Sequence, residues 1–358
     1  MDLSWALYLG LCAVPLLTLL PLWQREGWWI RAFEFPAVQV AVLTAVALAL
    51  ALWAFEWSWG WGLWLPAVLL GCTGLQLARI LPYTVLFPNQ IQTARQLRPQ
   101  DQLKVLVANV LMTNRNAGAL IDLVQGRAPD LLLTLESDAW WQEQLTAIEQ
   151  EYPFSVKKPL DNLYGMHLYS RLDLENVHIA YLVEEGVPSI HADVILRSGT
   201  RVRLHCLHPA PPSPTENPTS AERDGELLLV ARELDAKAGP VVVMGDLNDV
   251  AWSASTRLFQ KISGLLDPRI GRGLFSTFHA GYWLLRWPLD HVFCSGDFTL
   301  VSIQRLGHIG SDHFPIEAIL QHTPRARNLH PEPEASPRDV ERAEEKIAQV
   351  DADQTALP

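Results

Sequence analysis

The chain has 358 residues, of which 49% are hydrophobic and 19% charged, and its net charge is −11. This length allows one large globular domain with further segments. Non-specific nucleic-acid binding usually needs a basic surface, so the acidic balance argues mildly against a general nuclease. The four cysteines show no zinc-type spacing; Cys206 and Cys294 are expected to be buried thiols, although a disulfide between them stays open.

The first ninety residues are overwhelmingly apolar, and charged residues become frequent near Arg95. We predict transmembrane helices in residues 1–90, at about 3–22, 35–55 and 61–81, because each run approaches the length that crosses a bilayer. Tryptophans crowd the edges of these runs and are typical of the headgroup zone. They are Trp23, Trp28 and Trp29 in the first loop and Trp57, Trp59 and Trp61 in the second. Length and aromatic belt disfavour the alternative, a buried helical bundle in a soluble protein.

Three spans would place the first loop and the C-terminal domain on the same side of a membrane. The first loop carries Arg25 and Arg31, whereas the second carries Glu56 and no basic residue. Under the positive-inside rule, this charge count favours a cytoplasmic C-terminal domain. The sequence gives no clear indication of oligomeric state.

Residues 100–322 alternate short apolar strands with helical stretches, and strands follow one another in the middle of the segment. This order favours an α+β fold with packed sheets flanked by helices over a doubly wound fold. Strands are expected at 103–108, 130–135, 164–169, 178–183, 191–196, 201–207, 240–244, 289–294 and 317–321, and helices at 117–127, 139–149 and 222–236. Residues 323–358 are rich in Pro, Glu and Arg, so we expect a disordered tail with one short helix near 340–348.

Polar residues stand where several of the predicted strands end. Such ends gather at one sheet edge, a common place for an active site. Each residue alone has a plainer interpretation as a turn former or a satisfied histidine, but their joint occurrence favours one site. The set comprises Asn109, Glu136, His208, Asp246, Asn248, Asp290, Asp312 and His313.

These residue types suit phosphate ester hydrolysis. Glu136 offers a carboxylate that Mg²⁺ prefers, and Asp246 could orient or deprotonate a water molecule. Asn109, Asn248, His208 and His313 could hold phosphoryl oxygens. Asp290 could fix the tautomer of His313.

The ordered motifs Gly-Asp-Leu-Asn at 245–248, Leu-Asp-His-Val at 289–292 and Gly-Ser-Asp-His at 310–313 resemble the endonuclease/exonuclease/phosphatase superfamily. Asn109, Glu136 and the Leu-His-Pro-Ala-Pro segment at 207–211 match the same pattern, and the resemblance covers about residues 102–321. It implies a four-layer α/β/β/α sandwich, as in DNase-like proteins, preceded here by the bundle of about three transmembrane helices.

The resemblance also implies roles for individual residues. Glu136 would be a ligand of Mg²⁺, or alternatively Mn²⁺, with Asn109 and Asp312 nearby. Asp246 would position the water, Asn248 and His208 would bind phosphate, and His313 with Asp290 would complete the site. Many family members have a polar residue directly after the first Asn; here Asn114 is the candidate to replace it in substrate binding.

The apolar N-terminus resembles a bacterial branch of the family associated with glycopeptide resistance. That resemblance implies an integral protein of the bacterial inner or plasma membrane with an outward-facing catalytic domain, in conflict with the charge count. The aromatic segment 271–288 either lies against lipid, with Trp283 and Trp287 as substrate-contact candidates, or is ordinary core.

We therefore expect a membrane-anchored Mg²⁺-dependent phosphoesterase, either a phosphatase or a phosphodiesterase. Its partners would be membrane lipids and a phosphorylated, lipid-linked substrate such as a lipid or polyprenyl phosphate. Two alternatives stay open: a nuclease of the same superfamily, for which the sequence shows no Lys/Arg track, and a catalytically inactive membrane scaffold.

Overall fold

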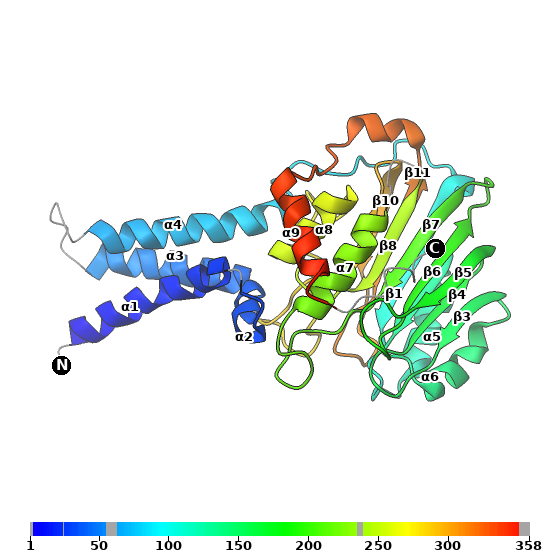
Figure 1. Cartoon of the computed structure of the whole chain (residues 1–358), viewed down its shortest axis with the longest axis horizontal. Helices are drawn as coiled ribbons and strands as arrows, with labels where there is room; N and C mark the ends of the chain where they lie inside the picture. The colour runs from blue at the N-terminus through cyan, green and yellow to red at the C-terminus, as the bar shows by residue number, and fades with distance from the viewer. Residues whose placement is uncertain (1–2, 24, 55–62, 235–238, 351–358) are drawn as a thin grey trace.

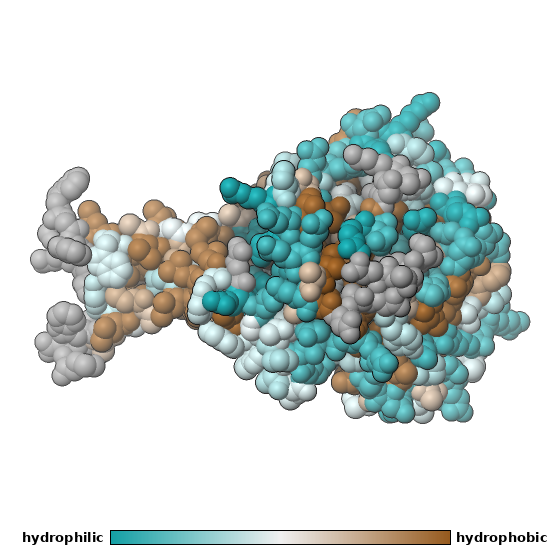
Figure 2. All heavy atoms as spheres, in the orientation of Figure 1, coloured by the Kyte–Doolittle hydropathy of each residue, from teal (hydrophilic) through white to brown (hydrophobic). Residues whose placement is uncertain are grey.

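The computed structural model describes residues 3–23, 25–54, 63–234 and 239–350. A stalk of three apolar helices projects from a larger domain built on two β-sheets (Figure 1). The visible face of the stalk is mainly hydrophobic, whereas much of the domain surface is hydrophilic (Figure 2). The stalk helices are α1 (Leu3–Leu19), α3 (Ala37–Ala54) and α4 (Trp64–Ile80).

Two stretches of the stalk, Ala6–Trp23 and Trp64–Tyr83, are long and apolar enough to cross a membrane. A third span would combine Trp28–Glu34 with Ala37–Trp53, two helical segments that meet at an angle of 71°. Pro36 lies at this bend and lacks the N–H that a continuous helix would use. The described residues therefore contain two possible spans, or three if the bent pair is one.

Short helices connect the stalk to the domain. After α1 come η1 (Leu20–Trp23), α2 (Trp28–Arg31) and η2 (Ala32–Glu34), while η4 (Leu81–Tyr83) follows α4. We call Trp28–Glu34 the connecting segment. The second predicted loop, with Glu56, Trp57, Trp59 and Trp61, lies outside the described residues.

The domain contains a six-stranded and a five-stranded sheet. Most neighbouring strands are antiparallel, but β1 pairs in parallel with β2, and β7 with β8. The first sheet has the order β10 (Phe298–Arg305), β11 (Ile316–His322), β1 (Gln102–Asn109), β2 (Leu131–Leu135), β4 (Met166–Ser170) and β3 (Phe154–Lys158). The second has the order β5 (Leu174–Ala180), β6 (Ser189–Ile195), β7 (Arg201–Leu207), β8 (Val241–Asp246) and β9 (Asp290–Cys294).

Three apolar clusters hold the layers together. The largest lies between the sheets and joins residues such as Val107 of β1 to residues such as Met244 of β8. A second packs the first sheet against α5 (Ala117–Arg127), α6 (Ala139–Gln144) and η6 (Leu145–Ile148). A third packs the second sheet against α7 (Ala221–Glu233), α8 (Ala254–Ser263) and α9 (Pro337–Ile347). The fold is thus α+β with two packed sheets and helices on both outer faces.

The segment after Thr323 differs from the expected disordered tail. It forms η7 (Pro324–Leu329) and then α9, which begins with a capping box between Ser336 and Asp339. Ala343 and Ile347 are spaced four residues apart, so they share one helix face, and both are buried beside α7. This narrow apolar face explains how a polar segment packs on the domain; residues 351–358 lie outside the described part of the chain.

Three elements of the domain were not expected from the sequence: β3, α8 and β10. Both unexpected strands are edge strands of the first sheet, where exposed positions weaken the apolar pattern. A short 3-10 helix, η5 (Pro99–Asp101), leads into β1. All four cysteines are free thiols, so Cys206 and Cys294 form no disulfide.

Candidate active site

Polar side chains from both sheets meet at one edge of the domain, where the central strands end. Asn109 closes β1 and lies beside Glu136, which directly follows the parallel strand β2. In the second sheet, the antiparallel register of β8 and β9 places Asp246 opposite Asp290. His313 lies in the loop that leads into β11. The topology therefore brings together five of the residues expected at the site.

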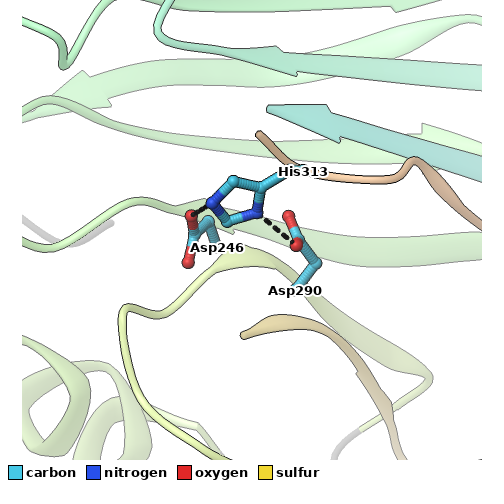
Figure 3. Close-up of side chains that lie close together, drawn as sticks. All are labelled: Asp246, Asp290 and His313. Atoms are coloured by element: carbon cyan, nitrogen blue, oxygen red, sulfur yellow. Dashed lines mark hydrogen bonds and ion pairs between the residues drawn. The ribbon is translucent and has the colours of Figure 1, made fainter. Parts of the chain in front are cut away.

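His313 lies between two carboxylates (Figure 3). Its Nδ1 is 2.8 Å from Asp290 Oδ2, and its Nε2 is 3.5 Å from Asp246 Oδ2. Burial acts to lower the pKa of His313, but Asp290 and Asp246 outweigh it and raise that pKa to about 10. His313 is therefore an imidazolium near neutral pH, held in orientation by Asp290.

The carboxylate of Asp246 is the centre of this hydrogen-bond network. Its Oδ2 accepts from Asn109 Nδ2 at 3.2 Å and faces His313, and its Oδ1 accepts from the main-chain N–H of Asn248 at 2.9 Å. Burial raises the pKa of Asp246, while the charge of His313 acts against that rise. A carboxylate has about four acceptor positions, so these three partners leave room for one further donor such as water.

Glu136 has a hydrogen-bond partner for only one of its two carboxylate oxygens among the described residues. Its Oε1 accepts from Asn109 Nδ2 at 2.7 Å, whereas its Oε2 is buried without a hydrogen-bond partner among the described residues. Burial raises the pKa of Glu136 to about 7, despite the hydrogen bond from Asn109. A buried carboxylate oxygen with no donor is a position suited to a cation.

Three backbone conformations at the site are unusual. Glu136 and Asn248 have φ angles of 58° and 51°, in the left-handed region that residues other than glycine rarely adopt. Gly245 has φ 148°, and a Cβ there would lie 1.9 Å from the carbonyl oxygen of Leu207. Such strain gathers at functional sites, and here it orients two of the expected site residues.

His208 lies behind the other site residues. It follows β7, is buried, and its ring centroid is 5.3 Å from that of Tyr164. Burial lowers the pKa of His208 to about 4, although Asp246 acts in the opposite direction, so the ring is neutral. Its Nδ1 has no partner in the described parts of the chain.

The two remaining polar candidates are Asp312, on the loop before β11, and Asn114, which contacts this loop. Asp312 lines the pocket described below, and its Oδ1 accepts from Ser311 Oγ at 3.3 Å. Asn114 instead donates from Nδ2 to the carbonyl oxygens of Val110 and Ile309, at 3.1 and 3.2 Å. The structure thus places Asn114 as a support of this loop, outside the pocket lining.

A pocket of about 510 Å³ lies over these groups. Catalytic-type side chains line one wall, namely Glu136, Asp246, Asn248, Asp312 and His313. Another part of the lining comes from the stalk side of the chain, with Trp28, Arg31 and Ala32 of the connecting segment and Phe35 after it. The sequence pattern did not predict this part, because only the tertiary fold brings residues 28–35 to residues 246–313.

Aromatic rings link the stalk to the catalytic groups. Phe35 and Trp287 pack edge to face with ring centroids 5.8 Å apart, and Trp287 stacks on Phe278 at 6.2 Å. Phe278 in turn lies 4.9 Å from the His313 ring. Of the two aromatic residues predicted to contact the substrate, Trp287 lines the pocket. Trp283 does not: it lies in a separate groove beside α3 and is 76% exposed.

Two places in the site could hold a metal ion. Asp246, Asp290 and His313 offer ligand atoms that lie within 4.8 Å of one another. In the second place, Glu136 offers a free carboxylate oxygen, with Asn109 beside it and Asp312 on the same pocket. Four carboxylates therefore face one imidazolium, and this excess of negative charge fits a divalent cation.

A family model described as the endonuclease/exonuclease/phosphatase family matches residues 106–313, more than half of the chain. The chain belongs to this family. Its members are hydrolases that act on phosphoester bonds and generally use divalent metals. The matched range includes the polar strand ends and all three motifs that carry the candidate site.

Solved structures agree on the fold. An endonuclease/exonuclease/phosphatase from Beutenbergia cavernae is 17% identical with a TM-score of 0.50, covering 62% of this chain and 72% of its own. The human nocturnin catalytic domain with bound sulfate is 16% identical, with a TM-score of 0.51 and coverages of 63% and 96%. TDP2 from D. rerio, complexed with a single-strand DNA product, is 17% identical, with a TM-score of 0.51 and coverages of 62% and 99%. No curated protein sequence matches the chain.

Proposed function

We propose that this protein is a divalent-metal-dependent hydrolase that cleaves phosphate esters at a membrane surface. Its substrate would be amphiphilic, such as a lipid or polyprenyl phosphate. The observation that carries the proposal is the composition of the pocket, whose lining combines the candidate catalytic residues with the segment between two apolar helices of the stalk. A substrate held in a bilayer by its tail would meet this pocket at the surface.

Glu136 is the preferred position for the metal within the site. The Asp246–His313–Asp290 group already contains a cation, the imidazolium, whereas Glu136 forms no ion pair among the described residues and its Oε2 has no hydrogen-bond partner there. Glu136 would hold the ion with help from Asn109 and Asp312, and Mg²⁺ suits such oxygen ligands. When bound, a divalent ion would supply charge neutralisation for phosphoryl oxygens.

The chain's own groups would perform the proton and positioning steps. Asp246 has one acceptor position left and lines the pocket. It would orient the attacking water and accept a proton from it. The Asn248 amide is held by the carbonyl of Pro209 at 3.0 Å and would donate its other hydrogen to the phosphoryl group. His313 would stabilise charge developing on the phosphate, with Asp290 keeping its ring in place.

The loop before Asp290 supports a position at the membrane. Four consecutive apolar or aromatic side chains are exposed there: Tyr282 by 61%, Trp283 by 76%, Leu284 by 59% and Leu285 by 46%. The carbonyl of Leu284 accepts from Gln39 Nε2 of α3 at 2.6 Å, so the loop is attached to the stalk. Exposed apolar patches of this kind mark interaction or membrane surfaces, and Trp and Tyr favour the interface.

The main alternative is a nuclease, because the structural relative TDP2 was solved with a single-strand DNA product. A substrate panel would separate the possibilities. The full chain in detergent would be assayed with a polyprenyl phosphate, a phospholipid, a soluble aryl phosphodiester and single-stranded DNA, each with and without a chelator.

We expect metal-dependent hydrolysis of the amphiphilic phosphate, lost in Asp246→Asn and His313→Ala and retained in the surface control Asp122→Asn. Faster cleavage of DNA than of any lipid would favour the nuclease. Equal inertness of wild type and both variants with Mg²⁺ and Mn²⁺ would leave the catalytically inactive scaffold as the better description.

A further inference from the structure

Two recesses outside the candidate active site meet at a single residue, Arg286. The first is an apolar groove of about 550 Å³ between α3 and the loop of residues 282–286. The second is a recess of about 570 Å³ beside β10, which Arg286 shares with Arg305. Neither lining contains Glu136, Asp246 or His313, so both are separate from the catalytic pocket.

The groove is shaped for a hydrocarbon chain. Its helical side is formed by Val38, Val42 and Val46, which are spaced four residues apart and so lie on one face of α3. Val42 is 61% exposed and Val46 50% exposed. At 1.5 Å per residue, these three valines mark out roughly 12 Å along the helix.

The recess beside β10 carries positive charge. The guanidinium groups of Arg286 and Arg305 both lie over the ring of Phe314, at 5.0 and 4.4 Å from its centroid. Their hydrogen bonds go to main-chain carbonyls, of Ala280 and Ser276 respectively. In the described residues neither arginine forms an ion pair with a carboxylate, and Arg286 Nε is buried without a partner. Two guanidinium groups that line one recess and have no carboxylate partner among the described residues favour an anion with several oxygens.

We propose that Arg286 and Arg305 bind the headgroup phosphate of an anionic phospholipid from the surrounding bilayer, whose acyl chain lies in the groove along α3. The position of Arg286 in both recesses supports a ligand with a charged head and an apolar tail. This lipid would be an accessory ligand that fixes the domain against the membrane, not the substrate. The inference rests on the proposed membrane location but not on the proposed hydrolysis.

The test is lipid retention by the full chain, measured by native mass spectrometry from neutral detergent with added phosphatidylglycerol or phosphatidylcholine. Wild type should retain phosphatidylglycerol in preference. The double substitution Arg286→Gln with Arg305→Gln should reduce that retention by roughly 20- to 30-fold, since each arginine near a bilayer contributes a factor of about five. Val42→Trp, which fills the groove and leaves both charges, should also reduce it.

The matched control, Arg325→Gln with Arg338→Gln, removes two exposed positive charges elsewhere and should retain the lipid as wild type does. Equal retention by wild type and the Arg286/Arg305 variant would overturn the proposal. So would equal retention of phosphatidylcholine, which would leave a groove with no headgroup preference. Displacement of the lipid by inorganic phosphate alone, with no effect of Val42→Trp, would contradict the role of the groove.

Discussion

Arg223 of α7 donates from its guanidinium to the main-chain carbonyl of Asn248 at 2.9 Å, beneath the catalytic loop. The same arginine pairs with Asp224 at 2.9 Å and with Asp249 at 3.4 Å, and all three side chains are buried. Asp224 in turn lies 3.8 Å from Arg31, whose side chain lines the pocket. One buried charge network therefore joins the connecting segment to the loop that carries Asn248.

The substitution Asp224→Asn should disrupt this network, because Asp224 also accepts from Lys346 of α9 at 2.9 Å. Arg223, Arg31 and Lys346 would each lose one of two carboxylate partners in the buried network, and we expect the free energy of unfolding to fall by about 3 kcal/mol. Thermal and denaturant unfolding of the full chain in detergent would measure the change. The control Asp122→Asn, on the exposed face of α5, should unfold at the same midpoint as wild type. Equal unfolding midpoints for the Asp224→Asn and Asp122→Asn variants would contradict a structural role for the network.

The ring contact between Phe35 and Trp287 should matter for amphiphilic substrates. If the substrate's tail passes the stalk side of the pocket, Phe35→Ala should raise KM for a long-chain phosphate about tenfold. The loss of one aromatic contact, with the burial that it provides, lowers binding by about 1–2 kcal/mol. Hydrolysis of a small soluble phosphodiester should change little, and the ratio of the two kcat/KM values is the measurement. Phe154→Ala, on edge strand β3, is the control; a similar loss on both substrates would instead indicate damage to the catalytic groups.

The carboxylate of Asp290 should control the protonation of His313. In Asp290→Asn the stronger of two acidic partners is lost, so the pKa of His313 should fall well below its value of about 10. We expect kcat to fall by about 10²- to 10⁴-fold, with an alkaline limb of the pH–rate profile moving toward neutral pH. NMR titration of the imidazole, beside steady-state kinetics, would check both effects. An unchanged imidazole pKa together with a lowered kcat would assign Asp290 another role.

Glycine is required at position 245 for a steric reason. Gly245→Ala would place a Cβ 1.9 Å from the Leu207 carbonyl oxygen, and φ is 148° there, so we expect a loss of about 3 kcal/mol or more of stability. Gly118→Ala is the matched substitution: nothing lies within 4 Å of its Cβ position in α5, and alanine should stabilise the helix by about 0.5–1 kcal/mol. Unfolding midpoints of the two variants should therefore move in opposite directions.

The sequence allowed much of the domain and its site to be predicted. Runs such as residues 103–108 and 130–135 are mostly apolar because their strands are largely buried on both faces, and the polar residues after them mark the strand ends. The convergence of Asn109, Glu136, Asp246 and His313 followed from this order. The edge strands β3 and β10 lacked such runs and were missed.

Other features depend on contacts that no local pattern encodes. The wall formed by Trp28, Arg31 and Phe35 results from packing between segments more than two hundred residues apart. The supporting role of Asn114 depends on the carbonyl of Ile309, which a motif comparison does not reveal. The helix α9 overlaps the short helix expected near residues 340–348, but its narrow apolar face did not indicate that Lys346 and Ile347 attach it to the domain.

Glu136 should make the metal-free protein less stable as pH rises. Its pKa is raised by burial to about 7 from an ordinary value of 4.5, so the folded state resists its ionisation and loses stability between those two pH values. The full loss, reached above pH 7, corresponds to about 3 kcal/mol at 1.4 kcal/mol per pKa unit. Glu136→Gln has no such charge, so in chelator its unfolding midpoint should vary less with pH than that of wild type and lie above it at pH 8.

Addition of Mg²⁺ or Mn²⁺ should reverse this order. A cation bound by the ionised carboxylate stabilises wild type by mass action, whereas Glu136→Gln should gain little and should hydrolyse substrate at least about 100-fold more slowly. Melting curves from pH 4 to 8, with chelator and with each metal, test both statements at once. If the metal raised the midpoints of wild type and Glu136→Gln equally, the ion would be bound elsewhere, and Asp246, Asp290 and His313 would be the group to substitute next.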